Sequence, residues 1–164
     1  MHFKRFLEIN DKENNKFIIF KNNKIFYETE IKTFLLDSKY LDIDIDNSTV
    51  IGIAESENKI YAVDISNCEN DINIGYKSLV EYDVRHLLAI SEPEDIVLMG
   101  RANQLLHWIR SNKYSGYSGE LNKFDTNEES LVCPTTSTMI YPSIAPCVFC
   151  LLYTSPSPRD RLKS

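Results

Sequence analysis

Two short turns in the last third of the sequence constrain most strongly what this chain can fold into. SGYSG occupies 115–119 and PTTS occupies 134–137, and each turn leads into a possible strand. LNKFDTNEE, at 121–129, is expected to be a loop between them. Residues 113–142 are therefore predicted to form a small β module that is too short to have much hydrophobic core of its own.

Two turns that each precede a strand are typical of a zinc ribbon, in which the metal supplies much of the folding free energy. SGYSG has serines where such a site needs sulfur ligands. From these five residues alone, an ordinary glycine-rich turn is the simpler interpretation. A module without metal would depend on packing against the rest of the chain.

The residues before the module indicate a domain rich in antiparallel β-structure. Residues 17–27 and 50–65 each contain two runs of β-branched and aromatic residues around a polar turn, which is the pattern of a β-hairpin. Between the hairpins, isoleucine alternates with aspartate up to residue 46, as in an edge strand with one solvated face. Antiparallel sheet is thus expected over most of the first 75 residues.

Two helices are predicted to follow this sheet. DVRHLLAI, at 83–90, is suited to a short helix. Ser91 and Glu94 have the spacing of a capping box, and Pro93 fits the first turn of a second helix that continues to residue 112. The fold class expected is therefore α+β.

Composition and charge exclude several classes of function. The formal net charge is −6, and an acidic surface repels a phosphate backbone, so nonspecific nucleic-acid binding is not expected. No apolar run approaches the roughly 18 residues of a membrane span, and MHFKRFLEIN does not resemble a signal peptide. We therefore expect a cytoplasmic protein whose four cysteines are free or metal-related.

Three motifs together resemble the middle of the NADH pyrophosphatases, a family of Nudix hydrolases. They are GRANQLLHWIRSNKYSGYSG at 100–119, LVC at 131–133 and YPSIAPC at 141–147. The resemblance implies a β-rich domain, a zinc ribbon and then a catalytic Nudix domain. It also implies a homodimer that cleaves NAD(H) or NAD-capped RNA to nicotinamide mononucleotide and an adenylate product, with zinc in the ribbon and Mg²⁺ or Mn²⁺ in the Nudix domain.

The resemblance places the four zinc-ligand positions of the ribbon at Ser115, Ser118, Cys133 and Thr136, so Cys133 is the one cysteine among them. Zinc binds thiolate or imidazole, whereas alkyl hydroxyls stay protonated near neutral pH. We therefore expect a module that keeps the turns of a zinc ribbon and has lost its metal. Hydrogen bonds from the hydroxyls to the backbone are expected to replace part of the coordination.

The resemblance also implies substrate contacts at Arg85, Glu128 and Tyr141. A guanidinium suits a pyrophosphate, a carboxylate suits ribose hydroxyls or an amide, and tyrosine offers an aromatic face with a polar tip. Each residue has an ordinary alternative: Arg85 could pair with Glu81, Glu128 could be a solvated acid and Tyr141 could be core. A lysine that the family uses earlier in the chain has no counterpart in FYETE, at 26–30.

The catalytic segment of the Nudix hydrolases, G-x5-E-x7-R-E-x2-E-E-x-G, does not occur in the sequence. From Cys150 onward, CLLYTSPSPRD resembles a translated sequencing adapter, so residues 148–164 are expected to be an artefactual tail. The expected domains are 1–111, resembling the family's N-terminal domain, and 112–147, a degenerate ribbon.

The sequence thus predicts an N-terminal fragment of an NADH pyrophosphatase-like hydrolase. The fragment itself is expected to be inactive and to carry no cofactor. The alternative is a non-catalytic dimerisation or nucleotide-binding module of the same descent.

Overall fold

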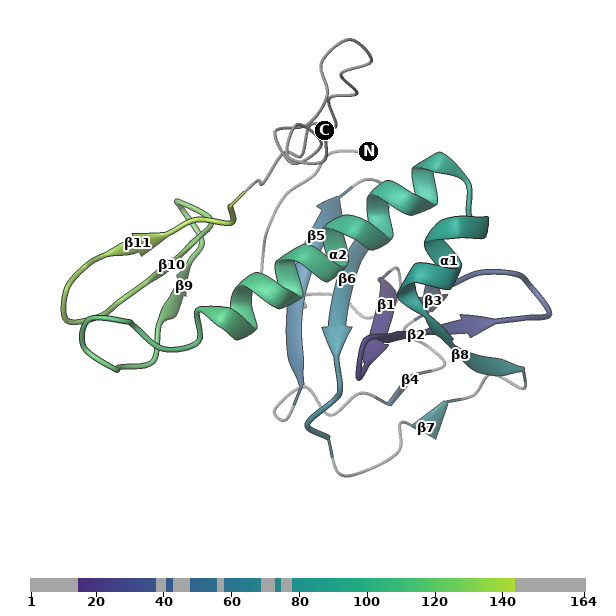
Figure 1. Cartoon of the computed structure of the whole chain (residues 1–164), viewed down its shortest axis with the longest axis horizontal. Coiled ribbons are helices and arrows are strands. Elements are labelled where there is room, and N and C mark those ends of the chain that lie inside the picture. Colours follow the sequence, from purple (N-terminus) through teal and green to yellow (C-terminus); the bar gives the residue numbers. More distant parts are fainter. Residues whose placement is uncertain are drawn as a thin grey trace, which may run out of the picture.

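The computed structural model (Figure 1) has an α+β fold, as the sequence predicts. In the described part of the chain, a six-stranded mixed sheet is followed by two helices and a three-stranded antiparallel sheet. The predicted tail at 148–164, which contains Cys150, lies outside the described residues, as does Cys147. The structure describes residues 15–37, 41–42, 48–55, 58–68, 73–74 and 78–143.

The first predicted hairpin is confirmed. β1 (Lys16–Lys21) and β2 (Lys24–Glu28) pair antiparallel around Asn22 and Asn23. Both asparagines have positive φ values, 49° and 66°, as in the two-residue type I′ turn that matches the twist of the flanking strands. Asparagine tolerates this left-handed conformation better than most residues, which explains why the chain turns here.

The second predicted hairpin is also confirmed, but it joins the first one in a way that the sequence did not indicate. β5 (Thr49–Glu55) and β6 (Lys59–Asp64) pair antiparallel, whereas β6 lies parallel to β1. In the parallel pair, Ile18 lies opposite Ala62. Both strands are buried along nearly their whole length, which is typical of strands covered on both faces.

Short strands complete the sheets of this domain. β8 (Leu79–Asp83) pairs antiparallel with β2, and β3 (Leu36–Asp37) pairs antiparallel with the start of β1. β4 (Leu41–Asp42) and β7 (Asn73–Ile74) form a separate two-stranded pair. The rest of the predicted edge strand, at 43–46, lies outside the described residues.

Both predicted helices are present, but the predicted capping box between them is wrong. α1 spans Val84–Ile90 and α2 spans Pro93–Ser111. The backbone N–H of Ser91 donates to the carbonyl of Leu87 at 3.0 Å, so Ser91 closes α1 and cannot open α2. Because the two helices are so close in sequence, the N-cap position of α2 falls on Glu92, whose side chain makes no capping hydrogen bond.

The large sheet is covered by apolar clusters on both faces, and α2 lies across one of them (Figure 1). Trp108 is 6% exposed and belongs to the cluster on this face. The other α2 residues in the cluster are Leu98, Met99, Ala102, Leu105 and Leu106. The opposite face is covered by Phe17, Ile19, Leu36, Tyr61, Val63 and Ile65. Neither helix has the length and apolar composition needed to cross a bilayer, among the residues described.

The small module, defined here as residues 112–143, follows the C-terminal end of α2. It contains β9 (Lys123–Asp125), β10 (Ser130–Val132) and β11 (Met139–Ile140) in the order β11-β10-β9. The prediction that all of 121–129 is a loop is wrong, because β9 lies within it and pairs with β10. LNKFD has few strand-forming residues, so β9 depends on its partner strand rather than on its own propensity.

Candidate functional site

The first turn of the small module (115–119) is closed by hydrogen bonds of its backbone. The N–H of Ser115 donates to the carbonyl of Glu120 at 2.8 Å, and the N–H of Gly119 donates to the carbonyl of Ser115 at 2.9 Å. The N–H of Ser118 also donates to the hydroxyl oxygen of Ser115 at 3.3 Å. Gly119 has a φ of +72°, a conformation that favours glycine.

The second turn (133–137) repeats this pattern 18 residues later. The N–H of Cys133 donates to the carbonyl of Thr138 at 3.0 Å, and the N–H of Ser137 donates to the carbonyl of Cys133 at 2.9 Å. Ser137, the counterpart of Gly119, also has a positive φ, 55°. The two turns therefore have the same backbone arrangement, although their side chains differ.

The four side chains at the predicted ligand positions meet between the two turns. The sulfur of Cys133 is fully buried, and the hydroxyl of Ser118 lies 3.2 Å from it. Hydrogen bonds with Ser115, Ser118 and Thr136 lower the pKa of Cys133 to about 6, and Ser115 makes the largest contribution to this shift. Burial opposes this shift and is the smallest of its causes. We call these four residues the Cys133 cluster.

The Cys133 cluster does not fit a zinc ion. It offers one thiol and three alkyl hydroxyls, and the hydroxyl oxygens already accept hydrogen bonds. Ser115 accepts the N–H groups of Tyr117 and Ser118, both at 3.3 Å, and Ser118 accepts that of Glu120 at 3.3 Å. Zinc sites use thiolate, imidazole or carboxylate ligands. Within the described ranges, no three His, Cys, Asp or Glu side chains are grouped to hold a metal.

Glu128 and Tyr141, two of the predicted substrate contacts, lie together on the surface of the small module. The hydroxyl of Tyr141 donates to a carboxylate oxygen of Glu128 at 3.1 Å, and Tyr141 is 48% exposed. This hydrogen bond, followed by partial burial, raises the pKa of Tyr141. Asp125 accepts the N–H of Asn127 at 2.8 Å, and this Asx-type contact shapes the turn that presents Glu128.

The third predicted contact, Arg85, lies elsewhere. It is exposed in the first turn of α1, where its backbone N–H donates to the carboxylate of Asp83 at 2.8 Å. Figure 1 shows α1 beside the end of α2 that is far from the small module. Glu81, the alternative partner considered for Arg85, instead pairs with Lys24 at 3.3 Å. Within one chain, the structure does not bring Arg85 to Glu128 and Tyr141.

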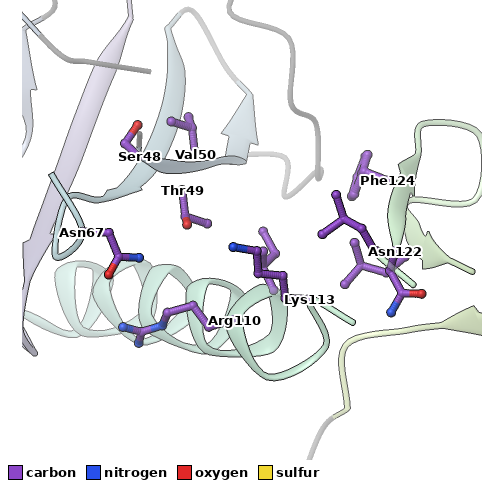
Figure 2. A pocket seen from close by; sticks show the side chains of 11 residues that line it. Ser48, Thr49, Val50, Asn67, Arg110, Lys113, Asn122 and Phe124 are labelled. Atoms are coloured by element: carbon purple, nitrogen blue, oxygen red, sulfur yellow. The ribbon is translucent and has the colours of Figure 1, made fainter. Parts of the chain in front are cut away.

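A cleft of about 500 Å³ separates the large sheet from the small module (Figure 2). Its polar lining includes Lys113, Arg110, Thr49 and Asn67, and Phe124 is among its apolar residues. Cationic groups beside apolar surface can bind a small anionic molecule with a hydrophobic part. Sequence reasoning missed this cleft because its walls come from three distant segments that carry no common motif.

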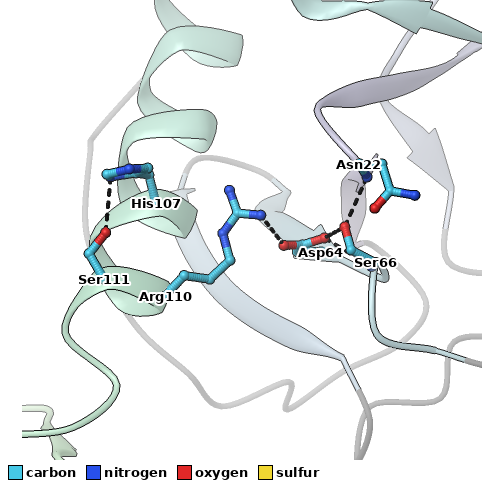
Figure 3. Close-up of polar contacts among 6 residues, drawn as sticks. All are labelled: Asn22, Asp64, Ser66, His107, Arg110 and Ser111. Atoms are coloured by element: carbon cyan, nitrogen blue, oxygen red, sulfur yellow. Dashed lines mark hydrogen bonds and ion pairs between the residues drawn. The ribbon is translucent and has the colours of Figure 1, made fainter.

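The cationic side of the cleft is held by an ion pair (Figure 3). The guanidinium of Arg110 donates to the carboxylate of Asp64 at 2.8 Å, and Asp64 is 5% exposed. The second carboxylate oxygen of Asp64 accepts the N–H of Ser66 at 3.0 Å and also its hydroxyl. The N–H of Asn22 in turn donates to the Ser66 hydroxyl at 2.9 Å. This network joins the end of α2 to β6 and to the first hairpin.

Comparison with known proteins found a distant relative over most of this chain. The chain is 25% identical over 127 residues to a protein of Photobacterium profundum named NAD-capped RNA hydrolase NudC. The match covers 77% of this chain and 44% of the relative, so the chain spans less than half the length of the curated protein it matches. No family model matches. At this identity, the comparison indicates a distant similarity to the NAD-capped RNA hydrolases.

Proposed function

We propose that this chain is the N-terminal part of an NADH pyrophosphatase-like hydrolase. The parent protein would cleave the pyrophosphate of NAD(H) or of NAD-capped RNA, releasing nicotinamide mononucleotide and an adenylate product. The observation that carries this proposal is the 3.1 Å hydrogen bond between Tyr141 and Glu128. The motif resemblance assigns both residues to substrate binding, and they meet on one surface. The distant similarity to the Photobacterium protein supports the proposed family of the parent.

Tyr141 and Glu128 would form one wall of a nucleotide site. The half-exposed ring of Tyr141 offers an apolar face on which a planar base can stack. Glu128 accepts the hydrogen bond that orients the ring, and its carboxylate retains capacity to accept from a ribose hydroxyl or a carboxamide. These residues would bind and orient the dinucleotide rather than cleave it.

Cleavage would require residues outside the 164 of this sequence. The acids that hold Mg²⁺ or Mn²⁺ against a pyrophosphate in Nudix hydrolases belong to a segment that the sequence does not contain. When bound, such a metal polarises the phosphoryl group and activates water. The chain by itself is therefore proposed to be inactive.

The parent is proposed to be a cytoplasmic homodimer. α1, which contains Arg85, lies beside the end of α2 that is far from the small module (Figure 1), so a second protomer is the simplest way to bring Arg85 and Tyr141 to one nucleotide. In this arrangement the guanidinium of Arg85 would contact the pyrophosphate. A reducing compartment keeps Cys133 in the free form that the Cys133 cluster needs.

Activity of the chain alone gives the first test. The purified 164-residue protein is mixed with NADH and Mg²⁺, and release of nicotinamide mononucleotide is followed by chromatography. We expect none above background, and turnover that survives repurification would refute the assignment of catalysis to a separate domain. The genomic DNA beyond the codon for Cys147 is the second test, because the proposal requires a Nudix segment in the same reading frame.

A non-catalytic nucleotide-binding module is the second candidate. The cleft that contains Lys113 and Arg110 favours it, because such a site needs no catalytic acids (Figure 2). A stop codon soon after Cys147, together with saturable binding of NADH by the chain alone, would support this candidate. Loss of that binding in Lys113→Ala would place the nucleotide in the cleft, whereas loss in Tyr141→Ala would place it on the small module.

A further inference from the structure

We infer that the two turns of the small module close without a metal ion, held by hydrogen bonds within the Cys133 cluster and by packing on α2. The inference concerns how the module folds and does not depend on the proposed function. It rests on three observations: the matching turns, the composition of the cluster, and the contacts between module and helix.

The matching turns show that the backbone arrangement does not depend on sulfur ligands. The second turn retains one cysteine, Cys133, whereas the first has serines at both ligand positions. Nevertheless, the hydrogen bonds that close the first turn at Ser115 and Gly119 have the same pattern as those at Cys133 and Ser137, and their lengths agree within 0.2 Å. The left-handed residue also falls at the same place in each turn. Backbone hydrogen bonds and turn residues therefore suffice to set this conformation.

The composition of the Cys133 cluster removes the need for a cation. Four thiolates close together repel one another, and a zinc ion offsets that charge. Here a single sulfur carries at most one negative charge, and the Ser118 hydroxyl lies 3.2 Å from it, so no excess of negative charge has to be offset. The sulfur has no exposed surface, and Ser115 is 5% exposed, so water is kept out of the centre of the cluster.

Contacts with α2 provide the stabilisation that a metal provides elsewhere. Leu131 of β10 is 6% exposed and belongs to the same apolar cluster as Trp108. Where the module leaves the helix, the side-chain amide of Asn122 donates to the carbonyl of Asn112, the C-cap residue of α2, at 2.8 Å, and the N–H of Asn122 donates to the carbonyl of Lys113 at 3.0 Å. The module is therefore continuous with the core of the larger domain.

The same geometry implies a latent metal site. Because the four side chains already converge, the triple substitution S115C/S118C/T136C would place four thiolates around one point. A control with the same number of cysteines is S115C/S118C/T135C. Thr135 hydrogen-bonds to Glu120 and is not among the residues that lower the pKa of Cys133, so its cysteine would miss the fourth position.

The test measures metal content and stability in the purified 164-residue chain. Wild-type protein grown with added zinc should contain far less than one ion per chain, and EDTA should leave its melting temperature unchanged. S115C/S118C/T136C should bind one Co²⁺ per chain with the visible absorption of tetrahedral thiolate coordination, and zinc should raise its melting temperature. The control should bind Co²⁺ more weakly and without that spectrum.

Either of two results would overturn the inference: stoichiometric zinc in the wild-type chain, or a lower melting temperature of the wild-type chain in EDTA. Equal Co²⁺ spectra for the triple variant and its control would also contradict it, because the four positions would then not converge. Should the triple variant fail to fold, hydrogen exchange decides the question in the wild type. The backbone N–H groups of Ser115, Gly119, Cys133 and Ser137 should be protected to the same extent with and without EDTA.

Discussion

The large sheet and the small module are stabilised by different means, although they share one helix. The sheet is covered on both faces by apolar clusters, and residues such as Ile18 and Ile51 are completely buried. The module has strands of two or three residues, and its buried centre is a sulfur among hydroxyls. Burial of apolar surface thus dominates in one region and directed hydrogen bonds dominate in the other. A region without its own core can keep its shape when a larger neighbour supplies one.

The largest loss of stability should come from a substitution in the core of the large sheet. Ile18→Ala removes a completely buried side chain between the sheet and α2 and should lower the free energy of unfolding by about 2–5 kcal/mol. Ile31→Ala is the matched control, because Ile31 is 61% exposed and its loss should cost less than about 0.5 kcal/mol. Urea denaturation of both variants checks the difference. Equal losses would show that burial does not distinguish the two sites.

Leu131→Ala should show whether the small module and the large sheet unfold independently. Leu131 joins the module to the core under α2, so its truncation should cost about 2–3 kcal/mol and act first on the module. Hydrogen exchange should become faster at Cys133 and Ser137 in the second turn, while β1 and β6 remain protected. Uniformly faster exchange in both regions would mean that sheet and module unfold as one unit.

Breaking the ion pair at the end of α2 should cost less stability than the two core substitutions. Arg110→Ala leaves the buried carboxylate of Asp64 without its guanidinium partner, but the Arg110 side chain is 38% exposed, so the expected loss is about 1–3 kcal/mol. Lys24→Ala breaks a more exposed pair with Glu81 and should cost at most about 1 kcal/mol. Thermal unfolding of the two variants compares them. A larger loss for Lys24→Ala would contradict this ranking.

The Cys133 thiol should make stability depend weakly on pH. Its pKa is lowered from the usual value of 9.0 to about 6 in the folded chain, so the thiolate stabilises the folded state above pH 6. This contribution should grow from pH 6 to 9, be complete above 9 and vanish below 6. The free energy of unfolding is measured against pH for two proteins, both with Cys68, Cys147 and Cys150 changed to serine. One keeps Cys133 and the other carries Cys133→Ser, and only the first should gain stability between pH 6 and 9. Thiolate absorbance should titrate near pH 6, and a midpoint near 9 would contradict the hydrogen bonds described.

The elements predicted from the sequence are those that depend on neighbouring residues. The first hairpin has Asn22 and Asn23 at its turn, and the second helix has apolar residues at helical spacing after Pro93. The parallel pair of β1 and β6 was not predicted, because strand partners that are distant in sequence leave no local pattern. β9 was missed for a related reason, since its strand conformation comes from pairing with β10.

Some residues of the candidate site could be named from the sequence, whereas their arrangement could not. The motif resemblance assigned Glu128 and Tyr141 to substrate binding, but residue types alone could not show that the two side chains are hydrogen-bonded. The same resemblance selected the four positions of the Cys133 cluster, whose convergence depends on two turns with equal backbone conformation. The cleft at Lys113 left no signal, because tertiary packing brings its walls together.

The most direct test of the account uses the protein encoded when the reading frame is extended past Cys147. The KM of this protein for NADH is compared in Tyr141→Ala, Glu128→Gln and the control Tyr117→Ala, whose ring is 85% exposed in the first turn. We predict NADH hydrolysis by the parent protein. Tyr141→Ala should raise KM about 5- to 150-fold, by analogy with the loss of roughly 1–3 kcal/mol when an aromatic residue that stacks on a base is removed. Glu128→Gln should have a smaller effect and Tyr117→Ala none. An extended protein that does not cleave NADH, or equal KM values for Tyr141→Ala and Tyr117→Ala, would contradict the account.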